Sequence, residues 1–187
     1  MKKTHLEASF ILSGYLCKDL NVKNLELFVY KNDEMLESII GNEKYLNIIQ
    51  IDYQGENPYY DFNIEIIKAC GIKKYYYQVV YLIAKYHLKL ISLTEILILL
   101  DDLSDELNGN LNYDYDGNKV NVYKLPIDLA GYSSEVSTHG EEFYRDNANK
   151  EIYKLLDAVD KDRSLYDYYI SQLGLYSQSF INKIQLF

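Results

Sequence analysis

Proline is scarce in this chain, which has only Pro58 and Pro126 among its 187 residues. Proline interrupts helices and inner strands because its ring fixes φ and its nitrogen has no hydrogen to donate. A chain with so few prolines favours long regular elements, and this length is typical of one domain with a buried core. The hydrophobic content of 48% also differs from that of disordered chains. We therefore predict a single globular domain over residues 1–187.

Apolar residues recur at three- and four-residue intervals in several segments, which is the spacing of one helical face. The pattern is clear over residues 73–88, where Val79, Val80 and Ile83 share a stripe. The same spacing predicts helices over 4–17, 32–40, 62–70, 141–160 and 162–174 or 164–174, and a short last helix after Ser177 or Ser179.

Ser92-Leu-Thr-Glu95 is the clearest local signal, because it matches a capping box. In that motif the Ser hydroxyl accepts from the N–H three residues on, and the Glu side chain reaches back to the Ser N–H. A helix is therefore predicted over about 93–107, ending at Asn108-Gly109. Its core-facing residues are predicted to be Ile96, Leu99, Leu100 and Leu103.

Two segments favour β structure. Residues 45–53 read YLNIIQIDY, contain three β-branched isoleucines and precede the breaker cluster QGENP, so a strand is predicted there. Asp116-Gly117 lies between residues 111–115 and 119–125, and such a pair accepts the positive φ of a hairpin turn. A hairpin over about 111–125 is therefore predicted, and the fold class is α+β, predominantly helical.

The formal net charge is −9, with a pI of about 4.8. Nucleic-acid binding depends on clustered Lys and Arg, and no such cluster occurs in the sequence. An acidic protein repels DNA, RNA and anionic lipid headgroups and attracts basic protein surfaces. We therefore expect a basic protein partner, no nucleic acid and no membrane; the oligomeric state is not predicted.

The sequence favours a cytoplasmic protein. Glu7 interrupts the start of the chain before any apolar signal-peptide core, and the apolar run that follows is broken by Gly14 and Lys18. The most apolar stretch, residues 75–100, is too charged for a membrane span. Cys17 and Cys70 both have apolar neighbours and are predicted to be reduced, packed thiols.

Residues 101–116 hold six carboxylates and no Lys or Arg. The predicted partner-binding residues are Asp101, Asp102, Asp105, Glu106, Tyr113, Asp114, Tyr115 and Asp116. The first four fall in the last turns of the predicted helix, where the macrodipole disfavours negative charge by about 0.3–1 kcal/mol each at exposed sites. Tyrosine has an apolar ring and a polar hydroxyl, which suit an interface. The total of 21 Tyr fits an AT-rich genome equally well.

No motif names a reaction. Residues 112–117 match the first half of a calcium-binding loop, but position 12 of that loop is Tyr123, where a bidentate Glu is needed. His5, His87 and His139 have no zinc-ligand spacing, and neither cysteine is flanked like an activated thiol. No catalytic residue, metal or cofactor is therefore predicted.

Three hypotheses remain. The first is an inhibitor that covers the basic active site of a partner such as a nuclease toxin, and the chain is similar in size and acidity to bacterial immunity proteins in general. The second is an adaptor or regulatory subunit that binds through an exposed apolar helix face. The third is a small hydrolase without a local motif, which a pocket joining His87 or His139 to two carboxylates would favour.

Overall fold

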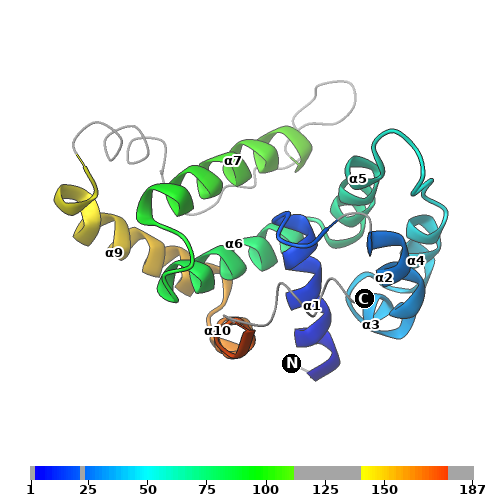
Figure 1. Cartoon of the computed structure of the whole chain (residues 1–187), viewed down its shortest axis with the longest axis horizontal. Helices are drawn as coiled ribbons and strands as arrows, with labels where there is room; N and C mark the ends of the chain where they lie inside the picture. Colours follow the sequence, from blue (N-terminus) through cyan, green and yellow to red (C-terminus); the bar gives the residue numbers. More distant parts are fainter. Residues whose placement is uncertain (1–2, 22–23, 112–139, 177–187) are drawn as a thin grey trace. The chain divides into compact units, whose positions relative to one another are not determined.

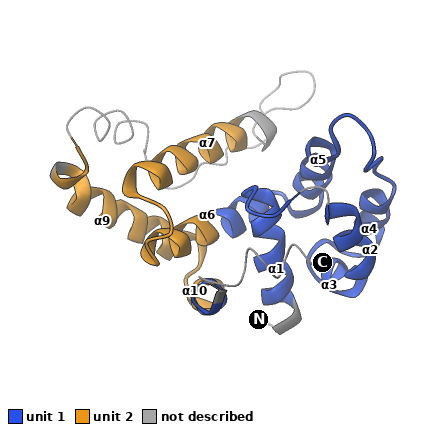
Figure 2. Ribbon diagram, in the orientation of Figure 1, with its two compact units in different colours: residues 1–78, 171–187 blue, residues 79–170 orange. Residues whose placement is uncertain are grey.

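The computed structural model describes residues 3–21, 24–111 and 140–176. Every regular element in these ranges is a helix (Figure 1). The chain divides into two compact units: residues 1–78 with 171–187 form unit 1, and residues 79–170 form unit 2 (Figure 2). The single-domain assignment stays a prediction. No helix within the described ranges combines the length and the apolarity that crossing a bilayer requires.

The predicted α+β class is wrong, because the predicted strand over 45–53 begins inside helix α4, Asn42–Ile49. Tyr45 and Ile48 are buried three residues apart, whereas Leu46 between them is 48% exposed. This is helical spacing, since alternate residues would share a face in a strand. The Tyr45 hydroxyl donates to the Val29 carbonyl at 3.0 Å. Packing of this face overrides the β preference of the isoleucines.

The predicted hairpin over 111–125 lies outside the described residues, except for its first position. Leu111 is the last residue of helix α7, Leu93–Leu111. The predicted short helix after Ser177 or Ser179 also lies outside them.

In its described part, unit 1 contains five complete helices, the first half of a sixth, and residues 171–176 at the end of the last described helix. The first six are α1 (Lys3–Leu16), α2 (Leu25–Lys31), α3 (Asp33–Ile40), α4, α5 (Pro58–Cys70) and the start of α6 (Ile72–His87). Gly41 separates α3 from α4 with φ 81°, and Gly71 separates α5 from α6 with φ 55°. Glycine adopts this left-handed conformation without a Cβ clash, so each helix can end at a sharp change of direction.

Long-range hydrogen bonds hold the end of α1 in unit 1. The Leu16 carbonyl accepts from the Tyr59 hydroxyl at 2.7 Å and from the Gln78 amide at 3.2 Å. Carbonyls in the last turn of a helix have no partner within that helix, so these side chains satisfy one of them. Cys17 and Cys70 are half-buried and are not joined in a disulfide, and burial raises the pKa of Cys70 to about 11.

Unit 2 is built from the second half of α6, α7, α9 (Glu141–Val159) and most of α10 (Ser164–Tyr176). Residues 79–84 of α6 are buried without interruption, as expected for a helix that is apolar on all sides. The core of unit 2 also contains fully buried residues of α7, α9 and α10, including Ile96, Leu97, Leu100, Ala148, Ile152, Leu155, Leu156 and Tyr169.

Asp160 sets the start of α10. Its carboxylate accepts from the backbone nitrogen of Tyr166 at 2.8 Å and from that of Leu165 at 3.4 Å. Burial nevertheless raises the pKa of Asp160, because desolvation outweighs these two hydrogen bonds. Of the two predicted starts, Asp162 and Ser164, the helix begins at Ser164.

Candidate functional site

The structure places half of the predicted partner-binding residues on one helix. Asp102 and Asp105 are exposed on α7, and Asp101 and Glu106 on the same helix are half-buried. The other four predicted residues, Tyr113, Asp114, Tyr115 and Asp116, lie outside the described residues, so their part of the site stays a prediction.

Two aliphatic side chains lie on the same exposed side of α7. Ile98 is 47% exposed and Leu99 is 37% exposed. The prediction that Leu99 faces the core is wrong; Leu97 is fully buried instead. Steps of three and four residues place Glu95, Ile98, Leu99, Asp102 and Asp105 along one side of the helix. We call these five residues the outward face of α7.

The negative charges on this face are less costly to the helix than the sequence indicated. The predicted end at Asn108-Gly109 is wrong, since α7 continues to Leu111. Asp102 is therefore more than two turns from the end, and the macrodipole acts mainly within the last turn. Within the described part of the chain, neither Asp102 nor Asp105 has an ion-pair partner. Their charges are available to a partner.

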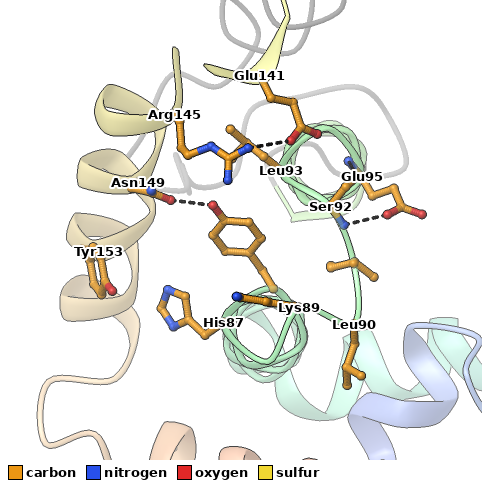
Figure 3. Close-up of a pocket in the computed structure, with 12 residues that line it drawn as sticks. His87, Lys89, Leu90, Ser92, Leu93, Glu95, Glu141, Arg145, Asn149 and Tyr153 are labelled. Atoms are coloured by element: carbon orange, nitrogen blue, oxygen red, sulfur yellow. Dashed lines mark hydrogen bonds and ion pairs between the residues drawn. The ribbon is translucent and has the colours of Figure 1, made fainter. Parts of the chain in front are cut away.

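A second candidate site is a pocket of about 630 Å³ within unit 2 (Figure 3). Tyr86 and His87 at the end of α6 form part of its wall, and residues 89–92 lead from there to the start of α7. Helix α9 contributes Glu141, Arg145, Asn149 and Tyr153. Residues from three helices and one connection therefore surround a single space.

Both carboxylates in the pocket hold the start of α7. The predicted capping box is confirmed, because Glu95 Oε2 accepts from Ser92 N at 2.7 Å and Ser92 Oγ accepts from Glu95 N at 3.1 Å. Hydrogen bonds from Ser92 lower the pKa of Glu95. Glu141 Oε1 accepts from Thr94 N at 3.1 Å and from Thr94 Oγ1 at 2.9 Å. The unpaired N–H groups of a helix start are electropositive, so these carboxylates stabilise α7.

Aromatic rings form the other side of the pocket. The imidazole of His87 stacks on Tyr153 with ring centroids 5.1 Å apart, and a 2.7 Å hydrogen bond joins its Nδ1 to the Tyr166 hydroxyl. The Tyr86 hydroxyl donates to Asn149 Oδ1 at 2.7 Å (Figure 3). Burial, and secondarily the charge of Arg163, lower the pKa of His87. Both effects favour the neutral form of His87.

The hydrolase hypothesis required a pocket that joins a histidine to two carboxylates. This pocket contains His87, Glu95 and Glu141, so it has those residue types. The described contacts do not assemble catalytic groups, however. Both carboxylates are occupied by N–H groups at the start of α7, and the hydrogen bond of His87 goes to a tyrosine, not to a serine or cysteine. The arrangement is suited to binding, and it names no reaction.

Residues 3–21, 24–111 and 140–176 contain no group of three His, Cys, Asp or Glu side chains that could hold a metal. This pocket is not among the predicted sites. One signal was present: Glu141, Arg145, Asn149 and Tyr153 recur every four residues and so line one side of α9. That stripe alone does not show which segments it faces. No family model, curated protein or solved structure has significant similarity to this chain.

Proposed function

We propose that this protein is a cytoplasmic inhibitor of immunity type, which binds a basic partner protein through the outward face of α7. The partner is expected to be a toxin domain, such as a nuclease, with a positively charged active site. The observation that carries this proposal is the position of exposed Ile98 and Leu99 beside Asp102 and Asp105 on one face.

The two kinds of side chain have different roles in such an interface. Exposed aliphatic groups lose contact with water on binding, which favours the complex in proportion to the buried apolar area. The carboxylates attract a basic surface over a longer range and raise the association rate. The net charge of −9 acts in the same direction. An apolar centre next to charged groups is the usual composition of a protein interface.

This proposal combines the inhibitor and adaptor hypotheses in one surface. An adaptor would also use Ile98 and Leu99, but it would not require carboxylates beside them. The salt dependence of binding separates the two, because exposed charges are screened within about 8 Å at physiological ionic strength.

The test is affinity capture from the lysate of the native organism at low and at high salt, with identification by mass spectrometry. We expect one basic protein that is retained at low salt and reduced at high salt. The purified pair is then compared for the wild type and the double variant Asp102→Lys/Asp105→Lys, for which we expect at least tenfold weaker binding and a smaller salt dependence.

A matched control reverses two exposed carboxylates elsewhere, in the variant Glu56→Lys/Asp146→Lys. This variant has the same net charge as the α7 variant, so it separates a local contact from general attraction. Equal affinity of the two variants would show that the outward face of α7 is not the interface. A third variant, Ile98→Ser/Leu99→Ser, is expected to dissociate faster with little change in salt dependence.

A further inference from the structure

We propose that the pocket at the start of α7 binds a small organic oxyanion, a phosphate or carboxylate, that carries a planar ring. The inference does not depend on the proposed partner of α7. The pocket volume of about 630 Å³ lies within the usual range of small-molecule sites, about 300–1,000 Å³.

Two cationic side chains reach this pocket from different segments. Lys89 lies in the connection between α6 and α7, and no ion-pair partner is described for it in residues 3–21, 24–111 and 140–176. Arg145 on α9 makes a long contact of 3.4 Å with Glu141, and half of its side chain is exposed. A guanidinium has five N–H donors, so one long contact leaves most of them for a ligand.

The carboxylates that line the same pocket use part of their hydrogen-bonding capacity on α7. Glu95 Oε2 and Glu141 Oε1 accept from N–H groups at the start of that helix, and Glu141 Oε2 makes the 3.4 Å contact with Arg145. The positive end of α7 offsets part of their negative charge. Lys89 and Arg145 remain the charged groups with donors to spare, so an anionic group is the one that the pocket can pair.

The ring is inferred from the aromatic wall. Tyr153 is 50% exposed and stacks on His87 with an interplanar angle of 30°, so two rings are already held against each other. A planar ring would extend this stack or pack against its edge, as aromatic groups prefer. Figure 3 shows His87 opposite Tyr153 and Arg145 nearer the start of α9, so ring and charge would occupy neighbouring parts of one pocket.

The backbone conformation at Lys89 allows its side chain to be removed with little effect on the fold. Lys89 has φ 58°, a left-handed conformation, and Leu90 N donates to the Lys85 carbonyl at 2.9 Å to close the end of α6. Glycine is the residue that best suits this position after a helix. Lys89→Gly therefore removes the ammonium group without disturbing the fold.

The experiment is isothermal titration calorimetry of the full chain with four probes. Adenosine monophosphate and 2-naphthoate each combine a ring with an oxyanion, whereas adenosine and inorganic phosphate each have one part. We expect at least one of the first two to bind tenfold more tightly than either of the last two. Binding of adenosine monophosphate alone would indicate a phosphate ligand, and binding of naphthoate alone a carboxylate.

The variants locate the binding. Lys89→Gly and Arg145→Gln are each expected to weaken it at least fivefold, and Tyr153→Leu to weaken it for ring-bearing probes. Lys150→Gln changes an exposed cation of α9 outside the pocket and is expected to leave it unchanged. The proposal is overturned if none of the four probes binds, if adenosine binds as tightly as adenosine monophosphate, or if Lys89→Gly and Arg145→Gln bind like the wild type.

Discussion

Two groups of carboxylates on and around α7 have opposite relations to the helix. Glu95 and Glu141 lie at its start and accept hydrogen bonds from backbone N–H groups. Asp102 lies at its middle and Asp105 one turn later, and neither has a described ion-pair partner. The first group stabilises the helix, whereas the second contributes little to the fold. A carboxylate's place along a helix therefore decides whether it is structural or available for binding.

The largest change in the free energy of unfolding is expected at a core residue next to the outward face of α7. Leu100 is fully buried and Leu99 is 37% exposed, although the two are adjacent. Leu100→Ala should lower the free energy of unfolding by about 2–5 kcal/mol, through lost burial and the cavity left behind. Leu99→Ala should lower it by less than about 1 kcal/mol, since less apolar area is lost. Urea denaturation of both variants measures the difference, and equal losses would place Leu99 in the core.

The next effect tests the structural role of the carboxylates at the helix start. Glu141→Gln keeps the size of the side chain but removes its negative charge, which strengthens the hydrogen bonds that Thr94 N and Thr94 Oγ1 donate to it. Because these hydrogen bonds to a charged group are half-buried, we expect the free energy of unfolding to fall by about 1–2 kcal/mol. The same urea titration measures this decrease. The isosteric change Asp102→Asn is the control, and a similar loss there would contradict the distinction between the two groups.

Unlike the outward face of α7, the pocket contains a histidine, His87, so its contribution to stability should depend on pH. Because the pKa of His87 is lowered in the fold, this side chain binds more protons in the unfolded chain than in the folded chain below about pH 6.5. The contribution of His87 to stability is therefore complete above that pH and is lost as the pH falls towards the folded pKa. Unfolding at pH 7.5 and 5.5 is compared in the wild type and His87→Asn, and we expect a smaller decrease in the variant. An equal decrease in both would mean that His87 titrates alike in the folded and unfolded chains.

The smallest effect is expected on the outward face itself. Asp102→Lys/Asp105→Lys should change the free energy of unfolding by less than about 0.5 kcal/mol, as is usual for exposed substitutions. A slight gain is the expected sign, since positive charge is favoured towards the end of a helix. Thermal unfolding measures the change. A marked loss of stability would show that these carboxylates are structural. Weaker binding by this variant would then reflect unfolding and not a lost contact.

Local signals in the sequence predicted several helix boundaries. The capping box at Ser92–Glu95 forms as expected, because its hydrogen bonds join residues three positions apart. On α9, Lys154 Nζ lies 2.6 Å from Glu151 Oε1, which is another contact between residues three positions apart. Asn108-Gly109 failed as a stop signal, since α7 continues through both residues. A turn signal is only a preference, and the helix can continue at a modest cost in free energy.

The two candidate sites also differ in how far the sequence could predict them. Asp101, Asp102, Asp105 and Glu106 are near one another in the sequence, and a helix keeps them together. The pocket joins side chains from Tyr86 to Tyr153, and no local pattern states which turns of α6 and α9 meet. Glu141 could not be predicted as a partner of Thr94, because 47 residues separate the two.

By itself the sequence determined the helical periodicity of the long segments, the start of α7 at its capping box and the acidic character of that helix, because these depend on neighbours within a turn or two. Only the tertiary structure decided that residues 45–49 are helical, that Leu97 is buried where Leu99 is exposed, and that His87, Lys89 and Arg145 share one pocket. The physical reason is that burial and long-range contact depend on which faces of distant helices pack together, and a preference of single residues for helix or strand is too weak to resist that packing.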